Sequence, residues 1–360
     1  MRRITRISIV VLAVSLILLL CRPLSPPGLK PAAPRRPAVL VFTGDILLAG
    51  RAGDAIKKEG PAAPFAGVID VLRSADLAVG NLECPLAVTG RPESKEYTFR
   101  ARPEAAEALS AAGFDIMTLA NNHTGDYGPG ALVETLAALK KNGVAAVGAG
   151  RNRDDARRFI LTTAGSPPIK IAILAFSNMQ PTDFYAGRKR PGTNPAWPSQ
   201  IKADVAAAHA RARLVVVLFH WGEELSEIPS KSQRYLARVA VEAGADLVVG
   251  HHPHVLQGLE QRGNALIAYS LGNFLFPSGG SAKQTMILRY SAAQKGPARA
   301  ELIPCEIEGF RPRIAAGQSR DKVMRHVGAL SRPLGVQIAA DGGVSIPLQT
   351  SLVDKAGRRP

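Results

Sequence analysis

A chain of 360 residues is long enough to bury one large hydrophobic core or two smaller ones. Its 46% apolar and 21% charged residues exclude an intrinsically disordered protein. The formal net charge of +16 favours a polyanionic partner, although the same charge also serves plain solubility. No basic tract interleaved with aromatic residues and no known nucleic-acid motif occurs, so we do not expect nucleic acid as a partner.

Residues 1–21 have the pattern of an export segment. The positive stretch MRRITR precedes an uninterrupted apolar run of 15 residues, from Ile7 to Cys21. That length suits a signal-peptide core and is marginal for a spanning helix. Cys21 occupies the position at which a lipoprotein is cleaved and acylated, but the preceding LLL lacks the usual small residue. A lipoprotein, an uncleaved signal-anchor and plain secretion stay open, and each places the body on the extracytoplasmic face of the cell membrane.

A proline-rich segment at 22–37 follows, with six prolines in 16 residues. This composition predicts an extended linker that holds the body away from a membrane. Residues 1–22 carry four arginines and no acid, so +12 of the +16 charge belongs to the rest of the chain.

From residue 38 onward, short apolar runs alternate with alanine-rich amphipathic segments. Continuous apolar runs of this length indicate strands buried on both faces. We expect strands at 38–44, 76–81, 115–121, 169–177, 213–220, 246–251 and 265–273. Helices are expected at 103–113, 130–143 and 233–244, each ending at a glycine. The alternation predicts a layered α/β domain.

The pattern changes beyond Lys283. Residues 285–293, 298–309 and 312–315 predict antiparallel strands that complete a second sheet, and residues 319–335 predict a helix. We therefore place the main domain at 38–318, with a C-terminal helix and extension at 319–360. Cys84 and Cys305 either pair, as cysteines of an exported chain do, or stay buried and free.

Nearly every apolar run ends in a polar cluster. Ligands of open α/β sheets bind beyond the carboxyl ends of the strands, so we expect these clusters to meet along one edge. The side chains gathered there would be those of Asp45, Glu83, Asn122, His123, His220, His251, His252 and His254. Carboxylate, amide and imidazole donors suit Mn²⁺, Fe²⁺ or Zn²⁺ better than Ca²⁺. A carboxylate such as Glu83 is able to bridge two cations, so we predict a site for one or two divalent metal ions.

Each of these residues also has an ordinary interpretation. Asp45 follows a glycine and could be a helix cap, and Glu83 could be a solvated loop acid. A histidine at a strand end, such as His220, is often a satisfied core residue. The three histidines within residues 251–254 are harder to explain without a function, because the chain has only seven.

Six motifs in order carry a family resemblance. They are GD at 44–45, GNLE at 80–83, ANNH at 120–123, HWG at 220–222, GHHPHVLQG at 250–258 and YSLGNFLF at 269–276. The series resembles the capsule-synthesis CapA family, which is linked to poly-γ-glutamate production and is similar to the calcineurin-like metallophosphoesterases. The resemblance implies an α/β fold, a four-layer αββα sandwich of metallophosphoesterase type, with a metal centre at one edge.

Carried over by motif, the resemblance implies metal ligands at Asp45, Glu83, Asn122, His220, His252 and His254. It implies that His123 is a catalytic acid, and we assign substrate binding to His251, Asn121 and Asn273. Leu47 stands where the phosphoesterase pattern has a histidine, so one metal position loses a ligand. Glu83 stands in place of the bridging aspartate.

Two functions from different classes are compatible with these residues. The first is a metal-dependent hydrolase of the cell envelope acting in poly-γ-glutamate synthesis or export, or on another anionic envelope substrate. The second is a non-catalytic component, which holds an acidic polymer within a membrane synthase or export complex. An envelope phosphoesterase unrelated to polyglutamate is a further alternative.

Overall fold

The computed structural model describes residues 36–345, so the expected export segment at 1–21 and nearly all of the linker at 22–37 lie outside the described residues. Helices and strands alternate along most of the chain, which confirms a mixed α/β fold. Arg36 already pairs with Ser166, so the folded body includes the end of the expected linker. Within residues 36–345, no helix combines the length and the apolar character needed to cross a bilayer.

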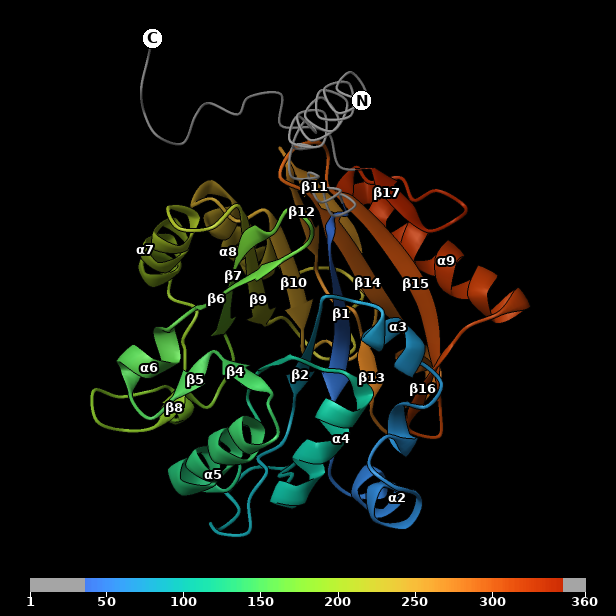
Figure 1. The fold of residues 1–360 in the computed structure, drawn as a ribbon. Helices are drawn as coiled ribbons and strands as arrows, with labels where there is room; N and C mark the ends of the chain where they lie inside the picture. Colours follow the sequence, from blue (N-terminus) through green and yellow to red (C-terminus); the bar gives the residue numbers. More distant parts are fainter. Residues whose placement is uncertain (1–35, 346–360) are drawn as a thin grey trace, which may run out of the picture. The chain divides into compact units, whose positions relative to one another are not determined.

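Two large sheets hold most of the strands (Figure 1). The first sheet is built around β1, with parallel neighbours on one side and antiparallel strands on the other. Its strands in spatial order are β16 (Arg311–Ile314), β15 (Arg299–Glu308), β14 (Gln284–Ala292), β1 (Ala38–Ile46), β2 (Leu77–Leu82), β3 (Ile116–Thr118) and β4 (Ala145–Val147). Two short strands join this path, β13 (Asn273–Leu275) beside β1 and β17 (Gly343–Ser345) beside β15.

The second sheet has a parallel centre and antiparallel edges. Its strands in spatial order are β11 (Leu259–Arg262), β12 (Ala265–Ala268), β10 (Leu247–His251), β9 (Leu214–His220), β7 (Ile169–Ser177) and β6 (Ile160–Ala164). A separate two-stranded sheet pairs β5 (Ala149–Gly150) with β8 (Gly192–Thr193).

Helices cover the outer faces of both large sheets. On the first sheet lie α2 (Arg51–Glu59), α3 (Ile69–Arg73), α4 (Ala106–Ala112) and α5 (Gly128–Lys141). On the second lie α7 (Pro198–His209) and α8 (Lys231–Glu242). Helix α6 (Arg153–Arg157) packs beside β5, and α9 (Gly317–Ser331) contributes Val323 and Val327 to the core between the sheets.

Strand β9 shows why the apolar runs are continuous. Leu214, Val216 and Leu218 belong to the core between the two sheets. Val215 and Val217, which alternate with them, belong to the core beneath α7 and α8. Because successive side chains of a strand point to opposite faces, both faces of β9 must be apolar.

Two expectations about the strands are wrong. Strands β14, β15 and β16 do not complete a second sheet, because β14 pairs antiparallel with β1 and extends the first one. The run at 265–273 is not one strand either. It breaks at 269–272, where Gly272 has a φ of 73°, and passes from β12 in the second sheet to β13 in the first. The crossing carries the chain between the two sheets at the edge where the polar clusters lie.

The question of the cysteines is settled for the two that the structure describes. Cys84 and Cys305 are both buried and free. Burial raises the pKa of each thiol to about 12, so both stay protonated at neutral pH.

Gly44 permits the closest approach between β1 and the crossing segment. A Cβ atom built at Gly44 would lie 1.9 Å from the carbonyl oxygen of Gly272. The backbone N–H of the next residue, Asp45, donates to that same oxygen at 3.0 Å. A side chain at position 44 would therefore push apart the two segments that position Asp45.

We expect Gly44→Ala to lower the free energy of unfolding by about 1–3 kcal/mol, the usual cost of overpacking. Gly130→Ala is the matched control, because Gly130 lies within α5 and a Cβ there meets nothing within 4 Å. The control should raise stability slightly, by up to about 1 kcal/mol. Urea denaturation of both variants measures the difference, and equal stabilities would contradict the constraint at Gly44.

Candidate metal centre

The carboxyl ends of strands from both sheets meet at one edge and are bonded to each other there. His251, at the end of β10, places its Nε2 atom 3.0 Å from the carbonyl oxygen of Thr43 in β1. The backbone N–H of His252 donates to Asp45 Oδ2 at 3.2 Å. Two clusters that are about 200 residues apart in sequence therefore share hydrogen bonds.

Asn81, at the end of β2, connects the acidic side chains. Its Nδ2 atom donates to Asp45 Oδ1 at 2.8 Å and to Glu83 Oε1 at 3.1 Å. The same atom lies 3.3 Å from His220 Nδ1. Asn81 was not among the predicted site residues, although it lies inside the GNLE motif that drew attention to Glu83.

His220 joins the second sheet to the loops that follow β2 and β3. Its Nε2 atom lies 2.8 Å from Asn122 Oδ1 and 3.3 Å from Glu83 Oε1. Its ring centroid is 4.8 Å from that of His252.

The His254 ring lies between the carboxylates of Asp45 and Glu83. Its Nδ1 atom lies 3.2 Å from Asp45 Oδ2, and its Nε2 atom lies 4.0 Å from Glu83 Oε2. Potential ligand atoms of Asp45, Glu83 and His254 all lie within 4.8 Å of one another. The structure thus gathers all six predicted ligands into one cluster: Asp45, Glu83, Asn122, His220, His252 and His254.

Burial and close contact shift the pKa values of the side chains in this cluster. Burial and the charge of Asp45 raise the pKa of Glu83 well above its usual range. Burial disfavours a charged His254, but Glu83 and Asp45 outweigh it and raise the pKa of His254 to about 10. Burial and the neighbouring His254 lower the pKa of His252 to about 3, so His252 is neutral at pH 7. Burial likewise lowers the pKa of His220.

A divalent cation fits these groups. Glu83 Oε2 and His252 Nδ1 are buried and have no hydrogen-bond partner. Unpaired buried polar atoms are costly, and a cation would satisfy both as well as the crowded carboxylates. Oxygen and imidazole nitrogen donors match Mn²⁺, Fe²⁺ or Zn²⁺. Neutral histidines are the form that binds a metal.

His123 lies beside the cluster in an ordered network of its own. Its Nδ1 atom is 2.9 Å from Asp126 Oδ2, an acid that is fully buried. Lys95 Nζ lies 2.7 Å from Asp126 Oδ1 and also donates to the backbone oxygen of Asn122 at 2.8 Å. Neither Asp126 nor Lys95 was predicted. The spacing of three residues from His123 pointed to Asp126, whereas Lys95 comes from a loop without any local pattern.

The three residues assigned to substrate binding are all buried and bonded within the protein. Asn121 donates to Asn81 Oδ1 at 3.0 Å and accepts the backbone N–H of His123 at 3.0 Å. Asn273 accepts at 2.8 Å from His254 Nδ1, and His251 Nε2 lies 3.0 Å from the carbonyl oxygen of Thr43. These contacts favour positioning roles over the direct substrate contacts that we expected.

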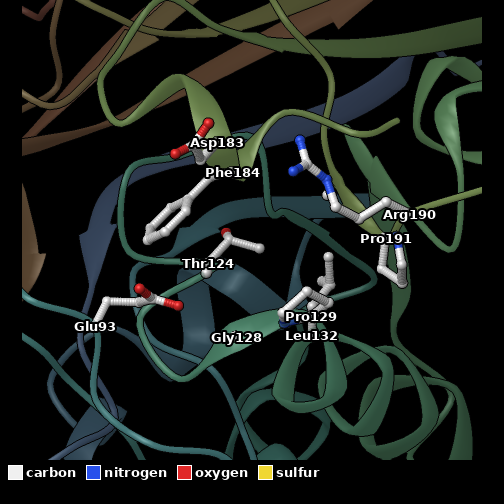
Figure 2. A pocket seen from close by; sticks show the side chains of 11 residues that line it. Glu93, Thr124, Gly128, Pro129, Leu132, Asp183, Phe184, Arg190 and Pro191 are labelled. Carbon is white, nitrogen blue, oxygen red and sulfur yellow. The ribbon is translucent and has the colours of Figure 1, made fainter. Parts of the chain in front are cut away.

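A pocket of about 370 Å³ opens next to the His123 loop (Figure 2). Thr124, Phe184, Arg190 and Glu93 are among its lining residues, and Figure 2 shows Thr124 between Glu93 and Arg190. Lys95 separates this pocket from the cluster, because its Nζ atom lies 5.6 Å from the Phe184 ring centroid and 3.3 Å from His123 Nδ1.

Comparison with known proteins agrees with the motifs. Residues 39–278 match the model of the family described as bacterial capsule synthesis protein PGA_cap. The chain belongs to this family. The PGA biosynthesis protein CapA of Bacillus subtilis is 33% identical over 274 residues, covering 75% of this chain and 72% of that protein. The capsule biosynthesis protein CapA of Bacillus anthracis is 30% identical over 298 residues, covering 80% of this chain and 72% of that protein.

Among solved structures, this PGA_cap member is similar to the calcineurin-like phosphoesterase YfkN from Bacillus subtilis. The TM-score is 0.40 at 13% identity, covering 84% of this chain and 98% of that one. A likeness at this level does not bear on the chemistry of the cluster.

The role of Glu83 is testable by metal binding. We expect Glu83→Gln to lose most of its affinity for Mn²⁺ and Zn²⁺, because an amide cannot ionise to give the cation a charged donor. In the metal-free protein the same change should raise stability at neutral pH, since burial and Asp45 raise the pKa of Glu83 in the folded chain and make its ionisation unfavourable there. In the wild type, cation at 100 times its Kd should add about 3 kcal/mol to the free energy of unfolding.

Elemental analysis and thermal melts with and without EDTA measure both effects. Glu107→Gln is the control, because Glu107 is an exposed acid on α4. Metal stabilisation of Glu83→Gln equal to that of the wild type would contradict the ligand assignment.

Proposed function

We propose that this chain is a metal-dependent hydrolase of the cell envelope that acts in poly-γ-glutamate capsule synthesis or export. The observation that carries the proposal is the convergence of Asp45, Glu83 and His254 in a member of the capsule-synthesis family. The names of the Bacillus relatives place those proteins in capsule or PGA biosynthesis. The order helix, sheet, sheet, helix supports the finer assignment to a sandwich of metallophosphoesterase type.

The cluster offers the groups that hydrolysis needs. A divalent cation held there would act as a Lewis acid and activate water near neutral pH. Asp45, Glu83 and His254 would hold it, and Asn81 keeps the two carboxylates in place through its amide. His220 and Asn122, which are bonded to each other beside Glu83, would help the cation to stabilise the charge that develops on the substrate.

His123 is the proposed proton donor to the leaving group. Asp126 accepts the Nδ1–H of His123, so Nε2 is the ring atom left for the substrate. Lys95 neutralises Asp126 and fixes the Asn122 carbonyl, and the Phe99 ring packs 4.7 Å from the His123 ring centroid. These contacts hold the ring in one orientation, which general acid catalysis requires.

An acidic polymer suits the surroundings of the site. The loop beside the pocket carries three exposed basic residues in a row, Arg188, Lys189 and Arg190, and Arg190 lines the pocket. Carboxylates of a polyglutamate chain would pair with this run, and Arg190 would do so from within the pocket. The bond that is cleaved would be a γ-amide of the polymer or a phosphoester of another anionic envelope substrate.

Attachment to the membrane is part of the proposal. It is supported by the basic and apolar pattern of residues 1–21 and by the proline-rich linker at 22–37. The body would then work on the extracytoplasmic face, beside a membrane synthase or export complex.

We expect His123→Gln to lower turnover by about 10²–10⁴-fold while metal content stays unchanged, because the residue donates a proton and does not hold the cation. Turnover is measured for the full chain in detergent on two substrates, poly-γ-glutamate and a chromogenic phosphodiester. His209→Gln is the control, since His209 lies on α7 and bonds to the Gly244 carbonyl.

The two substrates separate an amidase from a phosphoesterase. Wild-type protein that binds metal and polymer but turns over neither substrate would contradict the enzyme and favour the polyanion-binding component. Equal turnover by His123→Gln and the wild type would remove the proton-donor role.

Cys21→Ser tests the mode of attachment. For a lipoprotein, the change should abolish labelling by radioactive palmitate and release the chain from the membrane fraction. For a signal-anchor, membrane binding should be unchanged. Wild-type chain recovered only in the soluble extracellular fraction would contradict membrane attachment.

A further inference from the structure

A second group of potential ligands adjoins the predicted centre. Potential ligand atoms of Glu224, His252 and His254 lie within 4.8 Å of one another. The group shares His254 with the cluster of Asp45 and Glu83. Glu224 follows β9 in an irregular loop, and its side chain is exposed, whereas Asp45 and Glu83 are fully buried. Glu224 is therefore the carboxylate on the solvent side of the centre.

The Glu224 loop is held in place by bonds to the histidine segment. The backbone N–H of Leu225 donates to the Pro253 carbonyl at 2.8 Å. Gln257 Nε2 donates to the Ser226 carbonyl at 2.7 Å. The two residues that follow Glu224 are thus each bonded to the segment at 253–257.

The backbone on both sides of this contact is in an unfavourable conformation. Within residues 36–345, three residues other than glycine have positive φ angles: Leu225 at 60°, His252 at 97° and His254 at 60°. Such angles cost about 1–3 kcal/mol each and persist where the surroundings impose them. Two of the three, His252 and His254, belong to the ligand group of Glu224, and the third, Leu225, follows Glu224 directly.

His252 supplies an independent indication of a missing partner. Its side chain is 3% exposed, and its Nδ1 atom has no hydrogen-bond partner. A buried ring nitrogen without a partner is costly unless it binds a ligand. Glu224 is the carboxylate of its ligand group, so the two side chains are able to bind one cation together.

The two ligand groups also divide the carboxylates. Asp45 and Glu83 lie in the buried group, and Glu224 is the carboxylate of the group that contains His252, with His254 common to both. Carboxylate and imidazole donors together suit Zn²⁺ or Mn²⁺. Leu47, two residues beyond Asp45, packs into the core beneath the helices and supplies none. We propose that Glu224 is a metal ligand of this centre, which binds a divalent cation together with His252 and His254. The inference rests on the proposed metal-dependent function.

The test is the cation affinity of the full chain in detergent. Titrations with Mn²⁺, followed by the electron paramagnetic resonance of the free ion, give affinity and stoichiometry without any turnover. We expect Glu224→Gln to bind Mn²⁺ about 10- to 100-fold more weakly, or to lose one equivalent, because even residues that only support a ligand contribute this much. Glu223→Gln is the matched control, because Glu223 is an exposed acid next to Glu224 that does not belong to the ligand group.

Glu224→His keeps a donor at the position and should restore binding of Zn²⁺ but not of Mn²⁺, which prefers carboxylate. Equal Mn²⁺ affinity in Glu224→Gln and the wild type would overturn the inference. A wild-type chain that binds no cation would overturn both the inference and the metal centre. Weakened binding in Glu224→Gln, with no turnover by the wild type, would support the ligand and remove only the proposed hydrolase.

Discussion

The carboxylate of Asp45 links the end of β1 in the first sheet to the histidine segment that follows β10 in the second. One of its oxygens accepts from Asn81 in the neighbouring strand, and the other accepts from the backbone of His252 and faces His254 of the opposite sheet. The glycine before it lets the crossing segment approach within hydrogen-bonding distance. Every other feature of the centre depends on this arrangement, because it brings a second acid, Glu83, into the same buried space.

Two buried carboxylates repel each other and lose their hydration, so they require positive charge nearby. In the metal-free protein that charge is the proton of His254. A divalent cation would supply more charge and would also satisfy the unpaired Glu83 Oε2 and His252 Nδ1. The cluster therefore fits a divalent cation, and His252 and His254 on either side of Pro253 have positive φ angles that the surrounding structure imposes.

Around this centre the chain places groups that suit a large anionic substrate. The His123 and Asp126 pair lies on one side, with Lys95 between it and the pocket. Arg190 lies among the residues that line this pocket, together with Glu93 and Asp183. Membership of the capsule-synthesis family agrees with an acidic polymer as the substrate or partner. A bound cation and basic side chains would both attract the negative charges of such a polymer.

The sequence alone located the central strands of both sheets and helices α4, α5, α8 and α9, because apolar runs and capping glycines are local patterns, but it missed α2, α3, α6 and α7. It also placed polar side chains at the strand ends. Helix α5 and strand β7 lie close to their expected positions, and the ends of β1, β9 and β10 carry the expected acid and histidines. Only the tertiary structure decided that β14 pairs with β1, that the run at 265–273 divides between two sheets, and that Asn81, Lys95, Asp126 and Glu224 belong to the site. Asn81 and Asp126 lie within or near a local motif, but their bonds to Asp45 and Lys95 became visible only in the fold. The two strand pairings, Lys95 and Glu224 depend on contacts between segments far apart in sequence, and such contacts leave no period or spacing along the chain from which they could be inferred.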